Sequence, residues 1–225
     1  MEIKSNIIKH YLSNCYFITG TAYAGKSTMC KALAEKYNLY HCEENYNSDT
    51  IFNVIDIEDQ PNLSYFKTKE SWEEFLNRTP EDYESWLIGN NREIIGFEIA
   101  ELIRLSSNQK VIVDTNIPIE LLEEIADDNQ VAIMLSPPEI SSSRFFDRDD
   151  PEKKFLLEQI NLCANPDSTY QNFTACIEKF NRTDYKKFTQ SKFFTINRGF
   201  EDWTSKEETT EILGKHFGFT SNNKI

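Results

Sequence analysis

The stretch GTAYAGKST, residues 20–28, constrains the fold of this chain more than any other part of its sequence. Its fixed positions follow the pattern G-x-x-x-x-G-K-[ST], and they are Gly20, Gly25, Lys26 and Ser27. An apolar run at 15–19 precedes the pattern and predicts a buried strand, and apolar side chains at helical spacing follow it at 26–37. A chance match in an ordinary turn is the alternative. The chain has only 7 glycines, so such a match is rare.

The chemistry of a phosphate site explains the residue types in this loop. Glycines let the backbone curl so that successive N–H groups point at phosphate oxygens, and the following helix adds the positive end of its dipole. Lys26 is expected to reach the β- and γ-phosphates, and the Ser27 hydroxyl is expected to hold Mg²⁺. We therefore predict that ATP and Mg²⁺ bind along the whole loop, formed by Gly20, Thr21, Ala22, Tyr23, Ala24, Gly25, Lys26, Ser27 and Thr28.

Predicted strands and helices alternate along the rest of the chain. The expected strands are 15–19, 38–42, 110–114, 131–135 and 192–197. The expected helices are 26–37, two short segments around 72–76 and 83–87, then 91–106, 118–128, 152–162, 168–189 and 205–217. This alternation is typical of an α/β fold in which helices cover both faces of a parallel sheet, with three α/β/α layers. We predict one domain over 1–225, with a helical insertion at 45–90.

Composition narrows the range of partners. The net charge of −13 and the pI near 4.8 repel nucleic acids and anionic membrane surfaces, so we expect a small-molecule partner bound in a locally positive pocket. No apolar run approaches the roughly 20 residues that span a bilayer, and no secretory signal opens the chain. The five cysteines include no C-x-x-C pair, which favours reduced thiols and a cytoplasmic location. The three histidines are scattered, so no structural metal site is expected.

A carboxylate that could complete a magnesium site follows the strand KVIVD, at Asp114. A phosphate-binding loop of this kind normally needs a second carboxylate at the end of a neighbouring strand. The alternative is that Asp114 caps the next helix, because the residues after it, Thr115, Asn116 and Pro118, are also turn formers. Given the loop, the metal role is the interpretation that we favour.

The strings GTAYAGKST and VIVDTN resemble the P-loop kinases of nucleotides and small molecules, a P-loop NTPase group that includes adenylate, shikimate and polynucleotide kinases. The second string is most similar to the polynucleotide-kinase and zeta-toxin-like branch. The resemblance implies five parallel strands, a mobile lid, and an acceptor site beyond the second strand. It covers the loop, the Asp114 strand and a basic lid, but neither 45–90 nor 160–190. The Gly-Phe-Pro-Arg pattern of adenylate kinases is absent after Asp114, which argues against a nucleoside monophosphate acceptor.

In similar kinases, an acidic residue at the tip of the second strand orients the acceptor hydroxyl. Glu43 and Glu44 occupy that region here, where the usual residue is aspartate, and solvated loop charges are the alternative. Arg92 is a candidate for contact with an acceptor phosphate or carboxylate. Asn197 and Arg198 follow the last strand, where similar kinases place the loop beneath the adenine.

The predicted lid spans 139–155 and contains Arg144 and Arg148, four positions apart. A helix would place both guanidinium groups on one face, where they could close over the transferred phosphoryl group. The alternative is a surface helix with local ion pairs, because three aspartates lie among the arginines. We favour the catalytic role, and Arg148 above Arg144.

The sequence therefore predicts a Mg-ATP-dependent phosphotransferase that acts on a small hydroxyl or phosphate acceptor. A nucleotide-driven switch or regulatory ATPase is one alternative, and a non-catalytic nucleotide-binding module is another. The chain has no Asn-Lys-x-Asp motif for guanine, which weakens the switch interpretation, and its intact loop argues against a degenerate module. No residue pattern selects the acceptor or the oligomeric state.

Overall fold

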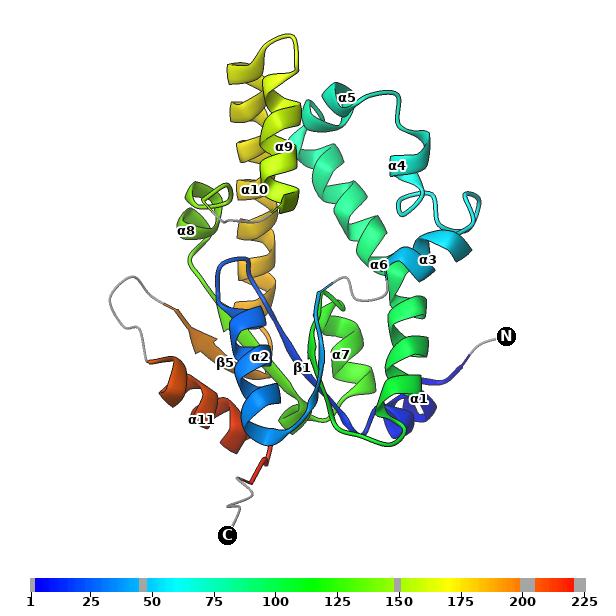
Figure 1. Ribbon diagram of the computed structural model, residues 1–225, viewed down its shortest axis with the longest axis vertical. Coiled ribbons are helices and arrows are strands. Elements are labelled where there is room, and N and C mark those ends of the chain that lie inside the picture. The colour runs from blue at the N-terminus through cyan, green and yellow to red at the C-terminus, as the bar shows by residue number, and fades with distance from the viewer. Residues whose placement is uncertain (1–2, 45–47, 148–150, 199–204, 221–225) are drawn as a thin grey trace.

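Five parallel strands form the centre of the protein. The computed structural model describes residues 3–44, 48–147, 151–198 and 205–220. The strands lie in the order β2-β3-β1-β4-β5, and every neighbouring pair is parallel (Figure 1). They are β1 (Cys15–Gly20), β2 (Tyr40–Cys42), β3 (Val111–Asp114), β4 (Val131–Leu135) and β5 (Phe194–Asn197). The predicted α/β fold with a five-stranded parallel sheet is confirmed.

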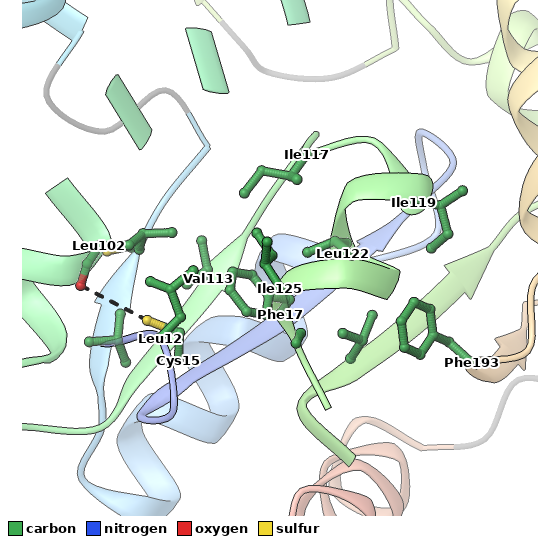
Figure 2. Packing of buried hydrophobic residues seen from close by; sticks show 14 of the residues in the cluster. Leu12, Cys15, Phe17, Leu102, Val113, Ile117, Ile119, Leu122, Ile125 and Phe193 are labelled. Atoms are coloured by element: carbon green, nitrogen blue, oxygen red, sulfur yellow. Dashed lines mark hydrogen bonds between the residues drawn. The ribbon is translucent and has the colours of Figure 1, made fainter. Parts of the chain in front are cut away.

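Side chains that alternate along the strands build a separate core on each face of the sheet. On β1, Cys15 and Phe17 face one core, whereas Tyr16 and Ile18 face the other. Figure 2 shows the first core, where Phe17 lies with Leu122 and other apolar side chains from the helices of that face. The helices α2 and α11 cover the opposite face. This arrangement gives the three predicted layers.

The helices mostly begin and end near their predicted positions. Their bounds are α1 (Ser5–Tyr11), α2 (Lys26–Tyr37), α3 (Ser48–Val54), α4 (Tyr65–Thr68), α5 (Trp72–Leu76), α6 (Pro80–Ser106), α7 (Ile119–Ile125), the 3-10 helix η1 (Asp128–Gln130), α8 (Pro138–Ser143), α9 (Pro151–Asn161), α10 (Pro166–Thr189) and α11 (Lys206–His216). The sequence did not predict α1, which packs against α7.

The two helices predicted around 83–87 and 91–106 are one continuous helix, α6. Pro80 occupies the first helical turn, where its missing N–H costs nothing, and the Thr79 hydroxyl caps the helix by accepting a hydrogen bond from the Asp82 N–H at 3.1 Å. Gly96 lies within the helix without breaking it. The prediction of two helices was therefore wrong, because the segment 88–90 between them is helical too, although Gly89 lies in it.

A helical part of the chain extends past the edge of the sheet where the strands end. In Figure 1, α9, α10 and the first half of α6 rise above this edge, and α3, α4 and α5 lie beside them. These helices have a third core, which includes Phe75, Tyr83, Phe173 and Ile177. The predicted insertion at 45–90 supplies three of its eight buried residues, and α10 supplies three more.

All five cysteines lie in the described part of the chain, where they are buried and unpaired, as the prediction of reduced thiols requires. None of the described helices combines the length and the hydropathy that crossing a membrane would need.

Candidate active site

The loop between β1 and α2 has the backbone conformation that its glycines predict. Gly20 has φ of 130° and Gly25 has φ of 89°, both in the left-handed region that glycine occupies easily. Tyr23 is also left-handed, with φ of 63°, which is uncommon for a residue with a side chain. Gly25 forms the N-cap of α2, so the helix begins at Lys26 with its first N–H groups beside the loop. This geometry suits an anion.

Neighbouring segments hold the loop in place. The Thr21 hydroxyl accepts a hydrogen bond from the Ser136 N–H at 2.7 Å and donates one to the Ser136 carbonyl at 3.1 Å. The Ser141 hydroxyl of α8 donates to the carbonyl of Ala22 at 2.7 Å. These contacts tie the loop to the end of β4 and to α8, so the backbone is already fixed before any ligand arrives.

Lys26 and Ser27 start α2 and face the end of β3. The ammonium group of Lys26 lies 3.5 Å from the carbonyl oxygen of Thr21. The Ser27 hydroxyl donates a hydrogen bond to Oδ2 of Asp114 at 2.5 Å. Parallel pairing of β3 with β1, with Ile18 opposite Asp114, brings the two residues together although they are 87 positions apart. The structure thus joins the two residues that the sequence proposed as magnesium ligands.

Asp114 is buried and incompletely bonded. Its side chain is 1% exposed, and within the described part of the chain its Oδ1 atom has no hydrogen-bond partner. Burial raises the pKa of Asp114, although Lys26 and the Ser27 hydroxyl act in the opposite direction. A buried carboxylate with an unsatisfied oxygen is costly unless a cation binds it. The capping alternative fails, because the N-cap of α7 is Pro118 and the Asp114 carboxylate accepts its hydrogen bond from the Ser27 hydroxyl instead of from α7.

The donor set at Asp114 fits Mg²⁺ better than a metal that needs a full protein cage. Among the described residues, no three His, Cys, Asp or Glu side chains gather as metal ligands. Mg²⁺ is commonly held by one or two protein oxygens, with phosphate oxygens and waters completing the octahedron. The Ser27 hydroxyl and the Asp114 carboxylate match this requirement.

A cavity of about 660 Å³ opens beside the loop. One end is formed by the loop residues, including Lys26 and Ser27. The rest extends between α6, α7 and α10, and includes Ile88, Ile95, Ile119, Ile177 and Phe180. The cavity therefore has a phosphate-binding end and a larger body, called the apolar body after these side chains, which charged residues such as Arg92, Lys153 and Asp184 also line.

Comparison with known proteins identifies the family. The family described as "AAA domain" matches residues 17–163, which include the loop, Asp114 and the predicted lid. This chain belongs to the AAA domain family. The membership confirms the resemblance to P-loop proteins of the kinase-like type, so the chain is a kinase-like nucleotide-binding protein.

No curated protein matches this AAA domain chain by sequence. A solved structure from Chloroflexus aurantiacus, described as a "putative kinase", also matches, with a TM-score of 0.41 and 11% sequence identity. The similarity covers 91% of the AAA domain chain and 99% of the other protein.

Only some of the residues that were predicted to bind the acceptor line the cavity of the AAA domain. Glu44 lines the cavity, and its Oε1 atom accepts a hydrogen bond from the Asn116 amide at 2.7 Å. Arg92 also lines the cavity, from the middle of α6 rather than the start of a helix as predicted, and its side chain is exposed. Glu43 is exposed and does not line the cavity. Of the two glutamates, the structure brings only Glu44 to the site.

The predicted lid has a different shape from the one expected. The helix α8 ends at Ser143, and Arg144 is its C-cap in a non-helical conformation. Arg144 is exposed and does not line the cavity. Arg148 lies outside the described residues. The prediction that Arg144 belongs to a helix shared with Arg148 was therefore wrong, because the backbone leaves the helix before it. Among the described residues of the predicted lid, Phe145 and Lys153 line the cavity.

The residues after β5 contact the loop from outside the cavity. One guanidinium nitrogen of Arg198 donates a hydrogen bond to the carbonyl of Tyr23 at 2.8 Å. Arg198 therefore holds the loop, and the predicted contact with adenine stays a prediction. Neither Asn197 nor Thr28 lines the cavity, and both are exposed.

Two polar residues of the cavity were missed from the sequence. Asn181 and Asp184 line it from α10, a segment that the sequence predicted only as a helix. Polar residues three positions apart beside Ile177 and Phe180 were the available signal. Spacing alone does not tell which helix face meets a ligand.

The raised pKa of Glu98, a residue of α6, leads us to predict that the stability of the protein depends on pH. Burial, and then the negative charge of Glu44, raises the pKa of Glu98 from 4.5 to about 7. The folded chain thus retains a proton that the unfolded chain releases, so stability falls as the pH rises through this window. We expect Glu98→Gln to raise Tm at about pH 8 and to change it little at about pH 5.

Thermal melts at the two pH values measure this difference. Glu123→Gln on α7, where the side chain is exposed, is the matched control and should behave as wild type. The explanation by a buried charge would be contradicted if the difference in Tm between Glu98→Gln and wild type were no larger at pH 8 than at pH 5.

Proposed function

We propose that this AAA domain protein is a Mg-ATP-dependent phosphotransferase acting on the hydroxyl group of a small molecule. One observation supports this most directly: the phosphate-binding end and the apolar body form a single cavity of about 660 Å³. The loop residues account for the phosphate groups only, so the other part of the cavity is available to the rest of the reactants. The second part offers a place for an acceptor next to the transferred group, where water is limited.

The residues of the loop would bind the phosphate groups of ATP and stabilise the transition state. Lys26 and the loop N–H groups would bind the phosphates and stabilise charge as it moves during transfer. The Ser27 hydroxyl and the Asp114 carboxylate would hold Mg²⁺, which supplies positive charge at the phosphate oxygens when bound. Positioning then lowers the barrier, because both reactants are held in one cavity.

The net charge of −13 favours a small acceptor over a long nucleic acid or an anionic membrane surface. A regulatory ATPase remains the second candidate function, because the loop and Asp114 would serve nucleotide hydrolysis equally well. The two functions differ in one measurable respect: a phosphotransferase releases ADP faster when its acceptor is present.

We expect purified protein to release ADP from Mg-ATP in the presence of a panel of small alcohols, and much more slowly without them. Lys26→Ala should lower the acceptor-dependent rate by about three orders of magnitude, because it removes the cation at the transferred phosphate. Coupled ADP detection and phosphate transfer from labelled ATP measure the two sides of the reaction.

Lys31→Ala is the matched control, since Lys31 is an exposed lysine of the same helix. Its rate should remain near that of wild type. ADP release that no acceptor accelerates would support the regulatory ATPase instead. Absence of ATP-dependent thermal stabilisation would contradict the nucleotide site itself.

A further inference from the structure

We propose that Asn181 and Asp184 of α10 bind the acceptor hydroxyl group, and that the acceptor is a neutral or cationic amphipathic alcohol. This inference rests on the proposed phosphotransferase function and gives it a substrate class. It assigns to α10 the role that the sequence predicted for Glu44.

The fold brings the two α10 residues to the same wall of the cavity. Asn181 and Asp184 are three positions apart, so they lie on one face of the helix. Both line the same cavity as Lys26. The packing of α10 against α6 and α8 fixes the position of this face.

Asn181 has an unused hydrogen-bond donor. The residue is 4% exposed, and its Nδ2 atom has no hydrogen-bond partner among the residues that the structure describes. Buried amide donors are normally paired, because an unpaired one loses its hydration without compensation. A ligand oxygen in the cavity would supply the missing partner. Asn181 is thus suited to donate to a hydroxyl or ether oxygen.

Asp184 provides the complementary acceptor. Burial raises the pKa of Asp184 to about 6. The positive charges of Lys187 and Lys26 lower this pKa, whereas the negative charges of Glu84 and Glu120 raise it. The group is therefore ionised at neutral pH and can accept a hydrogen bond from an alcohol. A carboxylate whose pKa lies near the working pH is also a suitable general base.

Asp184 is also better placed than Glu44 to serve an acceptor. Asp184 is half-buried and lines the same cavity as Lys26. Glu44 instead accepts a hydrogen bond from Asn116, in the segment after β3, and its side chain is exposed. A hydroxyl held by Asp184 and Asn181 would have the apolar body of the cavity around it.

The remaining walls define the chemical class of the acceptor. Apolar side chains from α6 and α10 surround the two polar groups, and they are Leu87, Ile88, Ile95, Ile177 and Phe180. The cations Arg92, Lys153 and Lys187 also line the cavity, where Arg92 and Lys187 are exposed and Lys153 is half-buried. Four carboxylates line the same space, and they belong to Glu44, Glu120, Glu124 and Asp184. The described lining outside the loop therefore offers no net positive charge to an anionic acceptor. A neutral or cationic apolar molecule with a hydroxyl group would be matched.

The transfer step balances with these residues. The acceptor oxygen forms a bond to the γ-phosphorus of ATP, and the bond between that phosphorus and the β,γ-bridging oxygen breaks. Asp184 takes the hydroxyl proton and returns it to solvent. The products are a phosphate ester, ADP and one proton.

The test compares three alcohols of different charge as acceptors for the full chain with Mg-ATP. The probes are 2-phenylethanol, 2-amino-1-phenylethanol and glycerol 3-phosphate. We expect ADP release to be accelerated by the first two and not by the third. Asp184→Asn should lower kcat/KM for the accelerating alcohols by about 10²-fold or more, and Asn181→Ala should raise their KM by about tenfold.

Two readouts separate this role from a structural one. The stabilisation of the protein by Mg-ATP should be the same in Asp184→Asn as in wild type. The fall in kcat/KM below about pH 6 should be present in wild type and absent in Asp184→Asn. Asp167→Asn, at an exposed aspartate in the first turn of α10, is the matched control and should match wild type.

The outcomes distinguish this inference from the proposed function. Full activity of Asp184→Asn together with loss of activity in Glu44→Gln would overturn the α10 assignment and leave the phosphotransferase intact. Turnover with glycerol 3-phosphate alone, or with none of the three alcohols while Mg-ATP still binds, would overturn the acceptor class. Failure of Mg-ATP to stabilise wild type would overturn both proposals.

Discussion

Gly20→Ala is expected to unfold the nucleotide site and to destabilise the whole protein. Gly20 has φ of 130°, and a Cβ atom built on it would overlap the carbonyl oxygen of Met134. That oxygen belongs to β4, which pairs with β1 at this point, so it cannot move without breaking the centre of the sheet. We expect a loss of about 3 kcal/mol or more, which corresponds to a fall in Tm of about 6–12 °C. Stabilisation by Mg-ATP should also disappear.

Gly96→Ala provides the matched control for this prediction. Gly96 lies inside α6, and nothing lies within 4 Å of a Cβ atom built there. Alanine is the better helix former, so this variant should gain about 0.5–1 kcal/mol. Thermal melts of both variants, with and without Mg-ATP, test the pair. Equal behaviour of the two glycine variants would show that the close approach of β1 and β4 is not what requires glycine at position 20.

The sequence predicted the central elements well because their signals are local. The run before the loop alternates between two buried faces, and the helix after it begins at Lys26, where the motif requires. The boundary at 88–90 was misjudged, because Gly89 and the two asparagines after it have low helix propensity, whereas packing of α6 against α10 keeps this segment helical. The short α1 was missed, since it has no buried residue and depends on contacts with other helices.

In the candidate site, too, some features could be predicted from local sequence signals and others could not. Ser27 and Asp114 could be paired from the sequence, because parallel strands that follow a known loop bring their ends to one edge of the sheet. The lid geometry could not be predicted, since the end of α8 before Arg144 depends on tertiary packing. The roles of Asn181 and Asp184 could not be predicted from the sequence for a related reason. Their helix has polar side chains on several faces, and only its packing against α6 decides which face meets the cavity.

Asp114→Asn is expected to lower phosphoryl transfer by about 10²–10³-fold with little effect on the fold. Asparagine keeps an oxygen that can accept the hydrogen bond from the Ser27 hydroxyl, but it lacks the charge that would hold Mg²⁺. Because burial raises the pKa of Asp114, its ionised form is disfavoured in the protein without ligand. Removing that charge should therefore cost less than about 1 kcal/mol, and Tm without ligand should fall by no more than about 2–4 °C.

This combination of results separates a metal ligand from a structural aspartate. A structural role predicts a large loss of Tm and an unchanged response to Mg²⁺. A metal role predicts a nearly normal Tm, a higher Mg²⁺ concentration for half-maximal activity, and less stabilisation by Mg-ATP. Asp128→Asn is the matched control, at an exposed aspartate that precedes β4 and thus lies at the opposite end of the sheet. Because its carboxylate is far from the loop, any effect of Asp128→Asn on the Mg²⁺ requirement would mean that net charge, rather than coordination at Asp114, sets that requirement.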